Sequence, residues 1–264
     1  MPVMLILGLG YTAGRLAERL RREGWHVVGV RRAAGPETLA FDDEDAVRAA
    51  IMGASHILSS VPPEGEGDPV LARYGDAIAA SPAVWTGYLS STGVYGDAGG
   101  AWVDEGCATG TRRRTARADA DAQWGALRRD MRRFRLPGIY GPGRSALDRV
   151  REGRAHRIAL PGQVFSRVHV DDIVAGVIAS FRGPPGIFNL ADDLPCSQNR
   201  VIEAACDLLG RGLPPLLSMD EAQLSPMARG FYAENRRVAN GRAKRLLGWR
   251  LVYPTYAQGL RACL

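Results

Sequence analysis

Short apolar runs alternate with amphipathic stretches along the first half of the chain. Residues 3–7, 25–30 and 84–90 have the length and the apolar content of buried strands. Between the first two runs, residues 15–23 repeat apolar side chains at helical spacing, and Gly24 ends the stretch. Strands that are separated by helices favour parallel pairing, so the pattern predicts an α/β fold built on a doubly wound parallel sheet.

The same alternation continues further along the chain. It predicts strands at residues 38–41, 56–61, 134–139, 164–168 and 187–190, and helices at 44–52, 70–80, 115–133, 171–181, 198–209 and 238–247. From about residue 145 the spacing becomes less regular. We therefore expect a first domain over residues 1–144 and a smaller lobe that takes up most of residues 145–264. Residues 164–190 are expected to pack back onto the first domain.

A glycine-rich loop, residues 8–14, joins the first predicted strand to the first helix. Gly8 permits a tight turn, Gly10 lets a ligand approach the backbone, and Ala13 or Gly14 lets the helix pack close to the strand. Amide donors at the helix N-terminus then favour a phosphate group. The loop stands inside a complete βαβ unit and therefore predicts a Rossmann-type domain that binds a dinucleotide. The residues assigned to this site are Gly8, Gly10, Tyr11, Thr12, Ala13 and Gly14.

The tip of the second predicted strand indicates which dinucleotide binds. A site for NAD usually has an acidic residue there, which binds the ribose 2′-hydroxyl. This chain has Arg31 and Arg32 instead, whose guanidinium groups can hold a 2′-phosphate. We therefore favour NADP(H) over NAD(H). The alternative is that both arginines are solvated surface residues of an arginine-rich chain.

Two further polar positions follow neighbouring strands. Asp42 or Asp43 could accept a hydrogen bond from an adenine amino group, although a helix N-cap for the segment from Glu44 onward explains the carboxylates equally well. Ser60, in the predicted strand 56–61, is also assigned to the nucleotide site.

Composition narrows the classes of partner. The 264 residues carry a net charge of +6, and Lys244 is the only lysine, so nearly all of the positive charge comes from arginine. The basic residues are spread along the predicted helices, so we expect no nucleic-acid partner. No apolar run reaches the ~18 residues of a membrane span and no secretory signal is recognised, which predicts a cytoplasmic location and no membrane partner. The scattered cysteines and histidines predict no metal site.

Five segments follow one another in an order that a known group of enzymes also has. They are the glycine loop at 8–14, LSSTGVYG at 89–96, RLPGIYGPG at 135–143, HVDDI at 169–173 and FNLADD at 188–193. Together they resemble the extended short-chain dehydrogenase/reductase superfamily, in its NAD-dependent epimerase/dehydratase group, and most closely an atypical bacterial branch. The resemblance covers nearly the whole chain and implies a nucleotide domain followed by a substrate-binding lobe.

The resemblance also implies where the chemistry would take place. In the family, a Ser or Thr at the position of Ser91 hydrogen-bonds the reacting oxygen, and Thr92 is the neighbouring alternative. A strand-end turn would also explain both hydroxyl groups. The family then expects a Tyr-x-x-x-Lys pair on the next long helix, but the corresponding positions here hold Arg113 and Arg117. Arginine stays protonated and cannot donate the tyrosine proton, whereas Arg117 could still contact the ribose or a phosphate.

The missing pair leaves three interpretations open. Another tyrosine, Tyr95 or Tyr140, substitutes for it; the reaction needs no tyrosine; or the protein binds NADP(H) without turnover. We keep Tyr140 as a candidate catalytic residue. For substrate binding the resemblance implies Arg144, Arg167 and His169, of which Arg167 suits an anionic group and His169 also suits a structural role.

The sequence therefore supports two functions from different classes. The first is an NADP-dependent oxidoreductase or epimerase-like enzyme that acts on a small polar metabolite, such as a nucleotide sugar or another anion. The second is a catalytically silent NADP(H)-binding protein that acts as a sensor or a scaffold. Both are compatible with a small-molecule partner and with a homodimer.

Overall fold

The central element is a parallel sheet, seen in a computed structural model that describes residues 1–65, 67–110 and 116–264. Its strands are β1 (Val3–Leu7), β2 (His26–Arg31), β3 (Thr38–Ala40), β4 (His56–Ser59), β5 (Trp85–Ser91), β7 (Met131–Leu136) and β11 (Gly186–Asn189). Within the described residues they form one seven-stranded sheet in the order β11-β7-β5-β4-β1-β2-β3, and every pair is parallel. The predicted doubly wound sheet is thereby confirmed.

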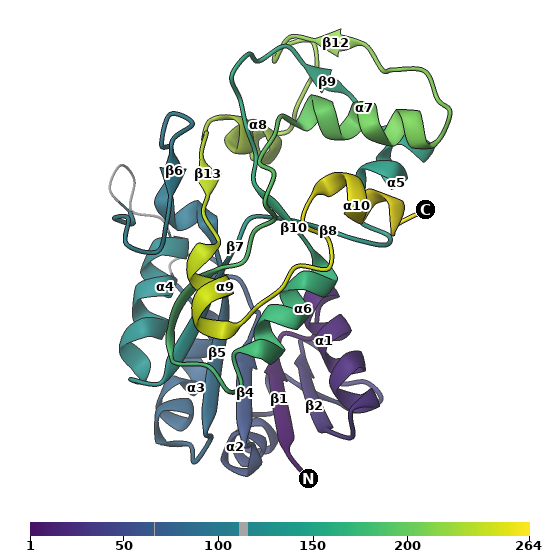
Figure 1. Ribbon diagram of the computed structural model, residues 1–264. Helices are drawn as coiled ribbons and strands as arrows, with labels where there is room; N and C mark the ends of the chain where they lie inside the picture. The colour runs from purple at the N-terminus through teal and green to yellow at the C-terminus, as the bar shows by residue number, and fades with distance from the viewer. Residues whose placement is uncertain (66, 111–115) are drawn as a thin grey trace.

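Helices cover both faces of this sheet (Figure 1). One face carries α1 (Tyr11–Arg22), α6 (Val170–Ala179) and α9 (Gly241–Leu247), and the other carries α2 (Glu44–Gly53), α3 (Pro69–Ala80) and α4 (Ala116–Leu127). Strand β1 shows why both faces are covered. Met4 and Ile6 pack toward α1, while Leu5 and Leu7 pack toward α2 and α3, and none of the four side chains is exposed. Strands buried on both faces read as continuous apolar runs, as in this sequence.

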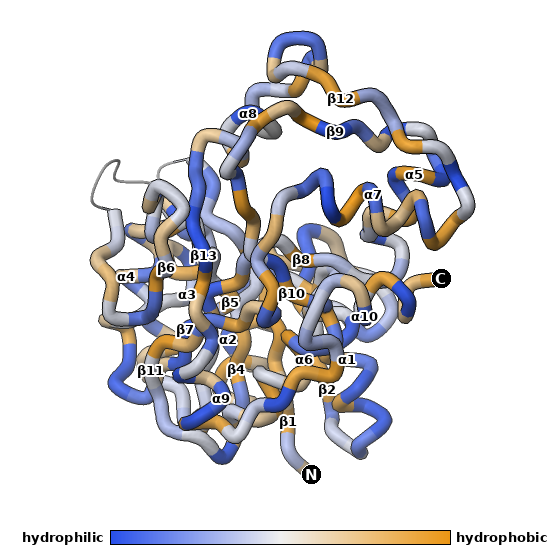
Figure 2. The backbone as a smooth tube through the Cα atoms, turned by 45° about the horizontal axis from the view of Figure 1, so that its top comes forward, coloured by the Kyte–Doolittle hydropathy of each residue, from blue (hydrophilic) through white to orange (hydrophobic). Residues whose placement is uncertain are grey.

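A smaller lobe lies above the carboxyl ends of the strands, and apolar and polar segments alternate along its chain (Figures 1 and 2). It contains α5 (Ala146–Arg151), α7 (Gln198–Leu208), α8 (Pro226–Tyr232), α10 (Tyr256–Arg261) and the short pair β9 (Arg157–Ile158) with β12 (Leu216–Leu217). Apolar residues of α5, α7 and α10 form a core of their own. The lobe is therefore held by packing that is separate from the two layers on the sheet.

Two short parallel ladders connect late segments to early ones. Strand β10 (Arg167–His169) pairs with β8 (Gly138–Tyr140), and β13 (Arg237–Val238) pairs with β6 (Trp102–Val103). A single turn of 3₁₀ helix, η1 (Thr92–Tyr95), follows β5. These contacts bring residues from both halves of the chain to the carboxyl end of the sheet.

The predicted helix over residues 115–133 is wrong over its last six residues. Helix α4 ends at Leu127, and strand β7 begins at Met131. Three arginines gave the strand a polar appearance, but all three donate hydrogen bonds inside the fold. For example, Arg132 donates to the Gly183 carbonyl at 2.7 Å, and Arg133 is paired with Asp121.

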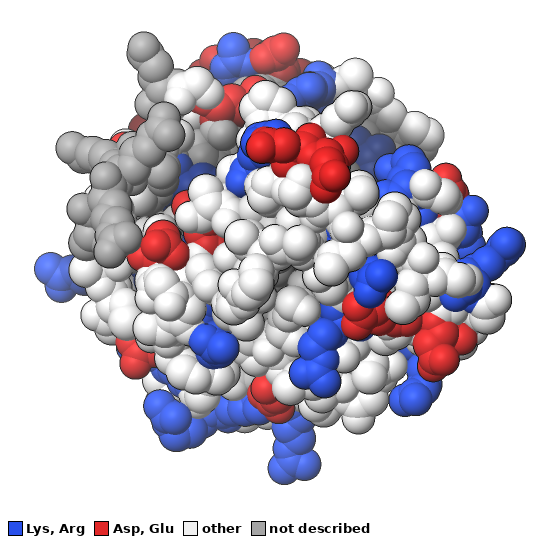
Figure 3. All heavy atoms as spheres, turned by 90° about the horizontal axis from the view of Figure 1, so that it is seen from above, with Lys and Arg blue, Asp and Glu red and all other residues white. Residues whose placement is uncertain are grey.

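The surface of the molecule carries charges of both signs. Viewed from above the lobe, basic and acidic groups are interspersed (Figure 3). Over the described residues, none of the helices combines the length and the apolarity that crossing a bilayer requires.

Candidate functional site

A cleft of about 1720 Å³ opens at the carboxyl ends of the parallel strands. The loops after β1, β4 and β5 line one side of it, and residues of the smaller lobe line the other. From β1 the chain turns to α1 on one face of the sheet, whereas from β4 it turns to α3 on the opposite face. This arrangement is the topological switch point at which open α/β sheets bind ligands.

Gly8 makes the turn at which the cleft begins. Its φ is +90°, and a Cβ there would lie 2.7 Å from Val61 Cγ2, which is closer than real side chains approach. The Gly8 amide donates to the Val30 carbonyl at 3.0 Å, and the Gly8 carbonyl accepts from Ser60 Oγ at 2.6 Å. Ser60 therefore fixes the glycine turn while it lines the cleft.

The N-terminus of α1 faces the cleft without a side-chain cap. Gly10 is the N-cap residue, and the first turn has no acidic residue and no capping side chain among the residues described. Free amide donors and the helix dipole favour an anion at such an end. Ala13 is 1% exposed against the sheet, whereas a Cβ on Gly14 would meet nothing within 4 Å. Close packing of helix on strand therefore depends on Ala13; Thr12 lines the cleft.

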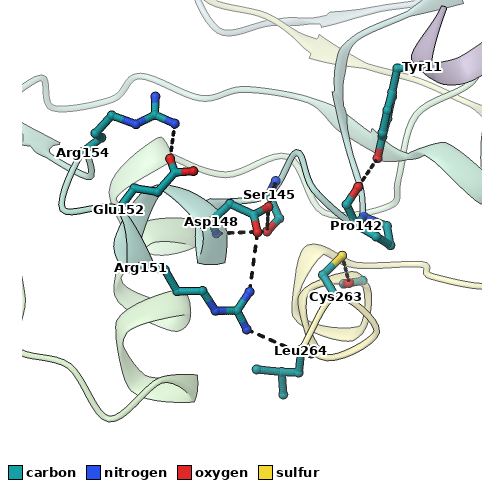
Figure 4. A network of polar contacts seen from close by, with 10 residues as sticks. Tyr11, Pro142, Ser145, Asp148, Arg151, Glu152, Arg154, Cys263 and Leu264 are labelled. Atoms are coloured by element: carbon teal, nitrogen blue, oxygen red, sulfur yellow. Dashed lines mark hydrogen bonds and ion pairs between the residues drawn. The ribbon is translucent and has the colours of Figure 1, made fainter.

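Tyr11 connects the glycine loop to the turn that follows β8. Its hydroxyl donates to the Pro142 carbonyl at 3.1 Å (Figure 4). Gly141 lies beneath this contact, since a Cβ there would be 2.6 Å from Tyr11 Oη. The guanidinium of Arg144 lies over the Tyr11 ring at 5.7 Å. Burial raises the pKa of Tyr11, so the phenol keeps the proton that this hydrogen bond needs.

The arginines at the tip of β2 both line the cleft. Arg31 is exposed at the end of the strand. Arg32 is 91% exposed in its side chain and pairs with Glu64 at 2.9 Å. Such an exposed ion pair is weak, so a stronger anion could replace the carboxylate.

The two aspartates after β3 are occupied elsewhere. Asp42 is paired with Arg73 in a separate surface depression and does not line the cleft. Asp43 caps α2, because its Oδ1 accepts from the Ala46 amide at 3.2 Å. Helix capping, the alternative weighed from the sequence, thus accounts for Asp43.

The hydroxyl groups at the end of β5 reach the cleft. Ser91 lines it and caps η1, because Ser91 Oγ accepts from the Gly93 amide at 3.1 Å. Thr92 lines it too, although only 4% of the residue is exposed. Arg117 is an exposed residue on the cleft wall, and a Cβ on Gly93 would lie 3.8 Å from Arg117 Cδ. Ser91 and Arg117 therefore approach the same glycine, whereas Arg113 lies outside the described residues.

A buried ionic network supports this strand end from below, and no pattern in the sequence indicated it. Asp121 of α4 accepts from Ser90 Oγ at 2.6 Å and from Arg135 Nη2 at 2.7 Å, and it also pairs with Arg133. Burial alone would raise the pKa of Asp121, but these partners, Arg135 foremost, hold it below its usual value. Tyr95 joins the network: its hydroxyl accepts from Arg135 at 3.1 Å. The Tyr95 hydroxyl is thus bound within the buried network.

Tyr140 and His169 are both turned toward α10. The Tyr140 hydroxyl is packed against Gly259 and, among the described residues, has no hydrogen-bond partner. Burial raises its pKa well above the usual range. His169 is 1% exposed, does not line the cleft, and caps α6 by accepting from the Asp171 amide at 3.2 Å. Burial lowers the pKa of His169, which suits the neutral ring that such a cap requires.

Arg167 is a buried charge in the wall of the cleft. Only 6% of the residue is exposed, yet it lines the cleft. Its guanidinium donates to Cys196 Sγ at 2.9 Å and to the Cys196 carbonyl at 3.4 Å, and it lies over the Tyr256 ring at 5.8 Å. Asp192 is buried beside this segment, and its amide donates to the Arg167 carbonyl at 2.7 Å.

Aromatic side chains from separate segments line the lobe end of the cleft. Phe165 and Tyr232 meet edge to face with ring centroids 5.4 Å apart. Phe231, beside Tyr232 on α8, is 66% exposed and lines the same cleft. Phe231 and Tyr232 of α8 are neighbours in the sequence, but no pattern in the sequence indicated that Phe165 would lie beside them.

Several known proteins share the fold of this chain. No family model matches the chain. A functionally unknown conserved protein from Silicibacter pomeroyi DSS is 43% identical, with a TM-score of 0.88 over 100% of this chain and 98% of that one. The human epimerase family protein SDR39U1, solved with NADPH, is 18% identical with a TM-score of 0.78 over 98% of each chain.

Two further similarities are more distant. UDP-N-acetylglucosamine 4-epimerase from Bacillus cereus is 12% identical, with a TM-score of 0.81 over 100% of this chain and 98% of that one. A 3-diazoavenalumate denitrifying reductase from a Streptomyces species is 28% identical over 142 residues, which are 48% of this chain and 45% of that protein. The structural matches confirm the fold expected from the resemblance stated above.

Proposed function

Because this chain belongs to one family with the Silicibacter pomeroyi protein and has the fold of the extended short-chain dehydrogenase/reductase superfamily, we propose that it is an NADP(H)-dependent oxidoreductase or epimerase-like enzyme. It acts on a small anionic metabolite held between the sheet and the lobe. The observation that carries the proposal is the glycine turn at the switch point, with an uncapped helix N-terminus facing a large cleft.

The loop fits a dinucleotide pyrophosphate. The space beside Gly8 is too small for a Cβ, and Gly10 leaves the backbone open where a phosphate approaches. The amides at the start of α1 would donate to the phosphate oxygens, and Ser60 would keep the turn in place. When bound, the nicotinamide supplies a hydride donor or acceptor.

The charge at the tip of β2 supports NADP(H) over NAD(H). Arg31 and Arg32 line the cleft where a ribose 2′-group would lie, and a 2′-phosphate would compete with Glu64 for Arg32. Asp42, which was considered for the adenine amino group, is paired with Arg73 outside the cleft. The human structural neighbour was solved with NADPH.

Calorimetric titration of the purified protein with NADPH, NADP⁺, NADH and NAD⁺ tests this part of the proposal. We expect NADPH to bind at least about tenfold more tightly than NADH, since a charge-assisted contact is worth about 1.5–3 kcal/mol. Tighter binding of NADH would overturn the cofactor preference alone. Absence of binding by all four nucleotides would overturn the proposed function.

For the chemistry we propose that Ser91 Oγ hydrogen-bonds the reacting oxygen of the substrate, with Thr92 as its neighbour and Arg117 contacting the ribose or a phosphate. Ser91 and Arg117 both border Gly93 on the cleft wall. Ser91→Ala should lower turnover with NADPH and leave nucleotide affinity unchanged, while Ser91→Thr should restore most of the turnover. Equal turnover in the alanine variant would remove Ser91 from the mechanism.

A silent NADP(H)-binding protein is the second candidate, and one observation favours it. Tyr140, the tyrosine kept as a candidate proton donor, buries its hydroxyl against α10, and Lys244 is paired with Asp193. A screen of NADPH oxidation over carbonyl substrates separates the candidates. Robust turnover of any substrate rules out the silent protein.

A further inference from the structure

Arg167 lacks an acidic partner at ion-pair distance. No carboxylate of the described residues lies within 4.0 Å of its guanidinium, whose contacts are instead to Cys196 and the Tyr256 ring. A charge that is 94% buried is costly unless a counter-ion reaches it. The buried Asp192 acts on Arg167 from beyond ion-pair distance, and burial raises the pKa of Asp192 to about 7, which weakens it as a counter-ion. The open side of Arg167 lines the cleft, so an anionic group of a ligand would complete its coordination.

An aromatic surface adjoins this cation. Phe165 precedes Arg167 by two residues, and both line the cleft. Tyr232 packs against Phe165 edge to face, and Phe231 extends into the cleft with 66% of the residue exposed. An exposed large apolar side chain inside a cleft indicates a surface that a ligand covers.

We propose that the lobe end of the cleft binds a small aryl carboxylate, such as a cinnamate-like acid, whose carboxylate is held by Arg167 and whose ring packs between Phe165, Tyr232 and Phe231. This inference rests on the proposed function, in which the same molecule is the substrate beside the nicotinamide.

Arg167 offers one buried positive charge, which a single carboxylate matches. Arg144 and Arg149 also line the cleft and are exposed, so the comparison with UDP-glucose tests whether a diphosphate binds through them instead.

The test is calorimetric titration of the full chain, with and without saturating NADP⁺, using four probes of related shape. The probes are cinnamate, cinnamamide, 3-cyclohexylpropanoate and UDP-glucose. We expect saturable binding of cinnamate, with cinnamamide and cyclohexylpropanoate each at least about tenfold weaker because one loses the charge and the other the ring. UDP-glucose should bind more weakly than cinnamate.

Variants locate the site. Phe231→Ala should weaken cinnamate roughly fivefold without loss of fold, because this side chain is exposed. Arg167→Met should weaken it at least about tenfold and abolish the preference over cinnamamide. Trp102→Ala, an equally exposed aromatic that does not line the cleft, and Arg250→Met, an exposed arginine outside it, should leave affinity unchanged.

Each outcome decides the matter. If cinnamate does not bind with or without NADP⁺, or binds no better than cinnamamide, the proposed aryl carboxylate is overturned. The affinity for NADPH tests the proposed function separately. Tighter binding of UDP-glucose than of cinnamate also overturns it, in favour of a nucleotide sugar. An affinity that Phe231→Ala leaves unchanged overturns the assigned surface.

Discussion

Replacing Gly8 with alanine tests the geometry on which the nucleotide site depends. The substitution adds a single methyl group at a backbone position with φ of +90°. The new Cβ would lie 2.7 Å from Val61 Cγ2 and 3.1 Å from the Val61 amide nitrogen. The side-chain contact can relax by rotation, but the backbone contact requires the turn itself to move.

The expected loss of stability follows from two contributions. A residue with a Cβ in the left-handed region costs about 1–2 kcal/mol, and overpacking a well-filled site costs about 1–3 kcal/mol. Because the turn can shift to relieve both at once, we expect a fall of about 2–4 kcal/mol in the free energy of unfolding. NADPH affinity should fall as well, since the shift displaces the amides that would receive the pyrophosphate.

Urea unfolding followed by far-ultraviolet circular dichroism measures the first effect, with the m-value checked for constancy. Gly14→Ala is the matched control in the same loop and helix. Its Cβ meets nothing within 4 Å, so it should stabilise α1 by about 0.5–1 kcal/mol. A Gly8→Ala protein within about 0.5 kcal/mol of the parent would refute the reasoning.

Four further substitutions have definite expected results. Asp121→Asn leaves the buried Arg135 without its counter-ion and should cost about 3–5 kcal/mol in urea unfolding. Burial lowers the pKa of His56 to about 4, so the stability that its neutral ring contributes is full above pH 6.5 and is lost as the pH falls to 4. The His56→Phe variant should therefore lose less stability than the parent protein between pH 7 and pH 5. Tyr140→Phe removes a buried hydroxyl without a partner in the described structure and should leave stability unchanged or raise it by about 1 kcal/mol, with turnover unaffected. Arg31→Ala should weaken NADPH roughly tenfold in calorimetry and leave NADH unchanged.

These predictions fail in different ways. Wild-type stability in Asp121→Asn would mean that the network beneath β5 relaxes freely. An unchanged pH dependence in His56→Phe would assign the acid sensitivity to other groups. A large loss of turnover in Tyr140→Phe would return this tyrosine to the chemistry, and equal losses for both nucleotides in Arg31→Ala would remove the basis for NADP preference.

The pattern of residues predicted those parts of the fold that depend on neighbours close in the chain. The glycine turn and the strands on either side of it follow from residues 3–30, because turn geometry and strand burial are set within that segment. The predicted strand began too late, at residue 134, and the predicted helix ended too late, at residue 133, because Arg133 and Arg135 of β7 pair with Asp121 from another element. A charge partner that is distant in sequence leaves no periodic signal.

The candidate site shows the same division. Gly8, Ser91 and Arg167 line the cleft as the motifs suggested. His169 carries a polar group that the family pattern associates with substrate, but the backbone of its own helix uses that group as a cap. Phe165 was not anticipated, because its role depends on Tyr232, which lies 67 positions later in the chain.

The position of α10 has a consequence for how the protein is made. This helix, which ends at Arg261, covers Tyr140 and supplies part of the lobe core, while β11 completes the sheet edge only after residue 189 has been synthesised. On a translating ribosome the early βαβ units can pair first, because chain segments fold in the order in which they emerge. We expect the lobe wall of the cleft to be complete only after α10 has left the exit tunnel.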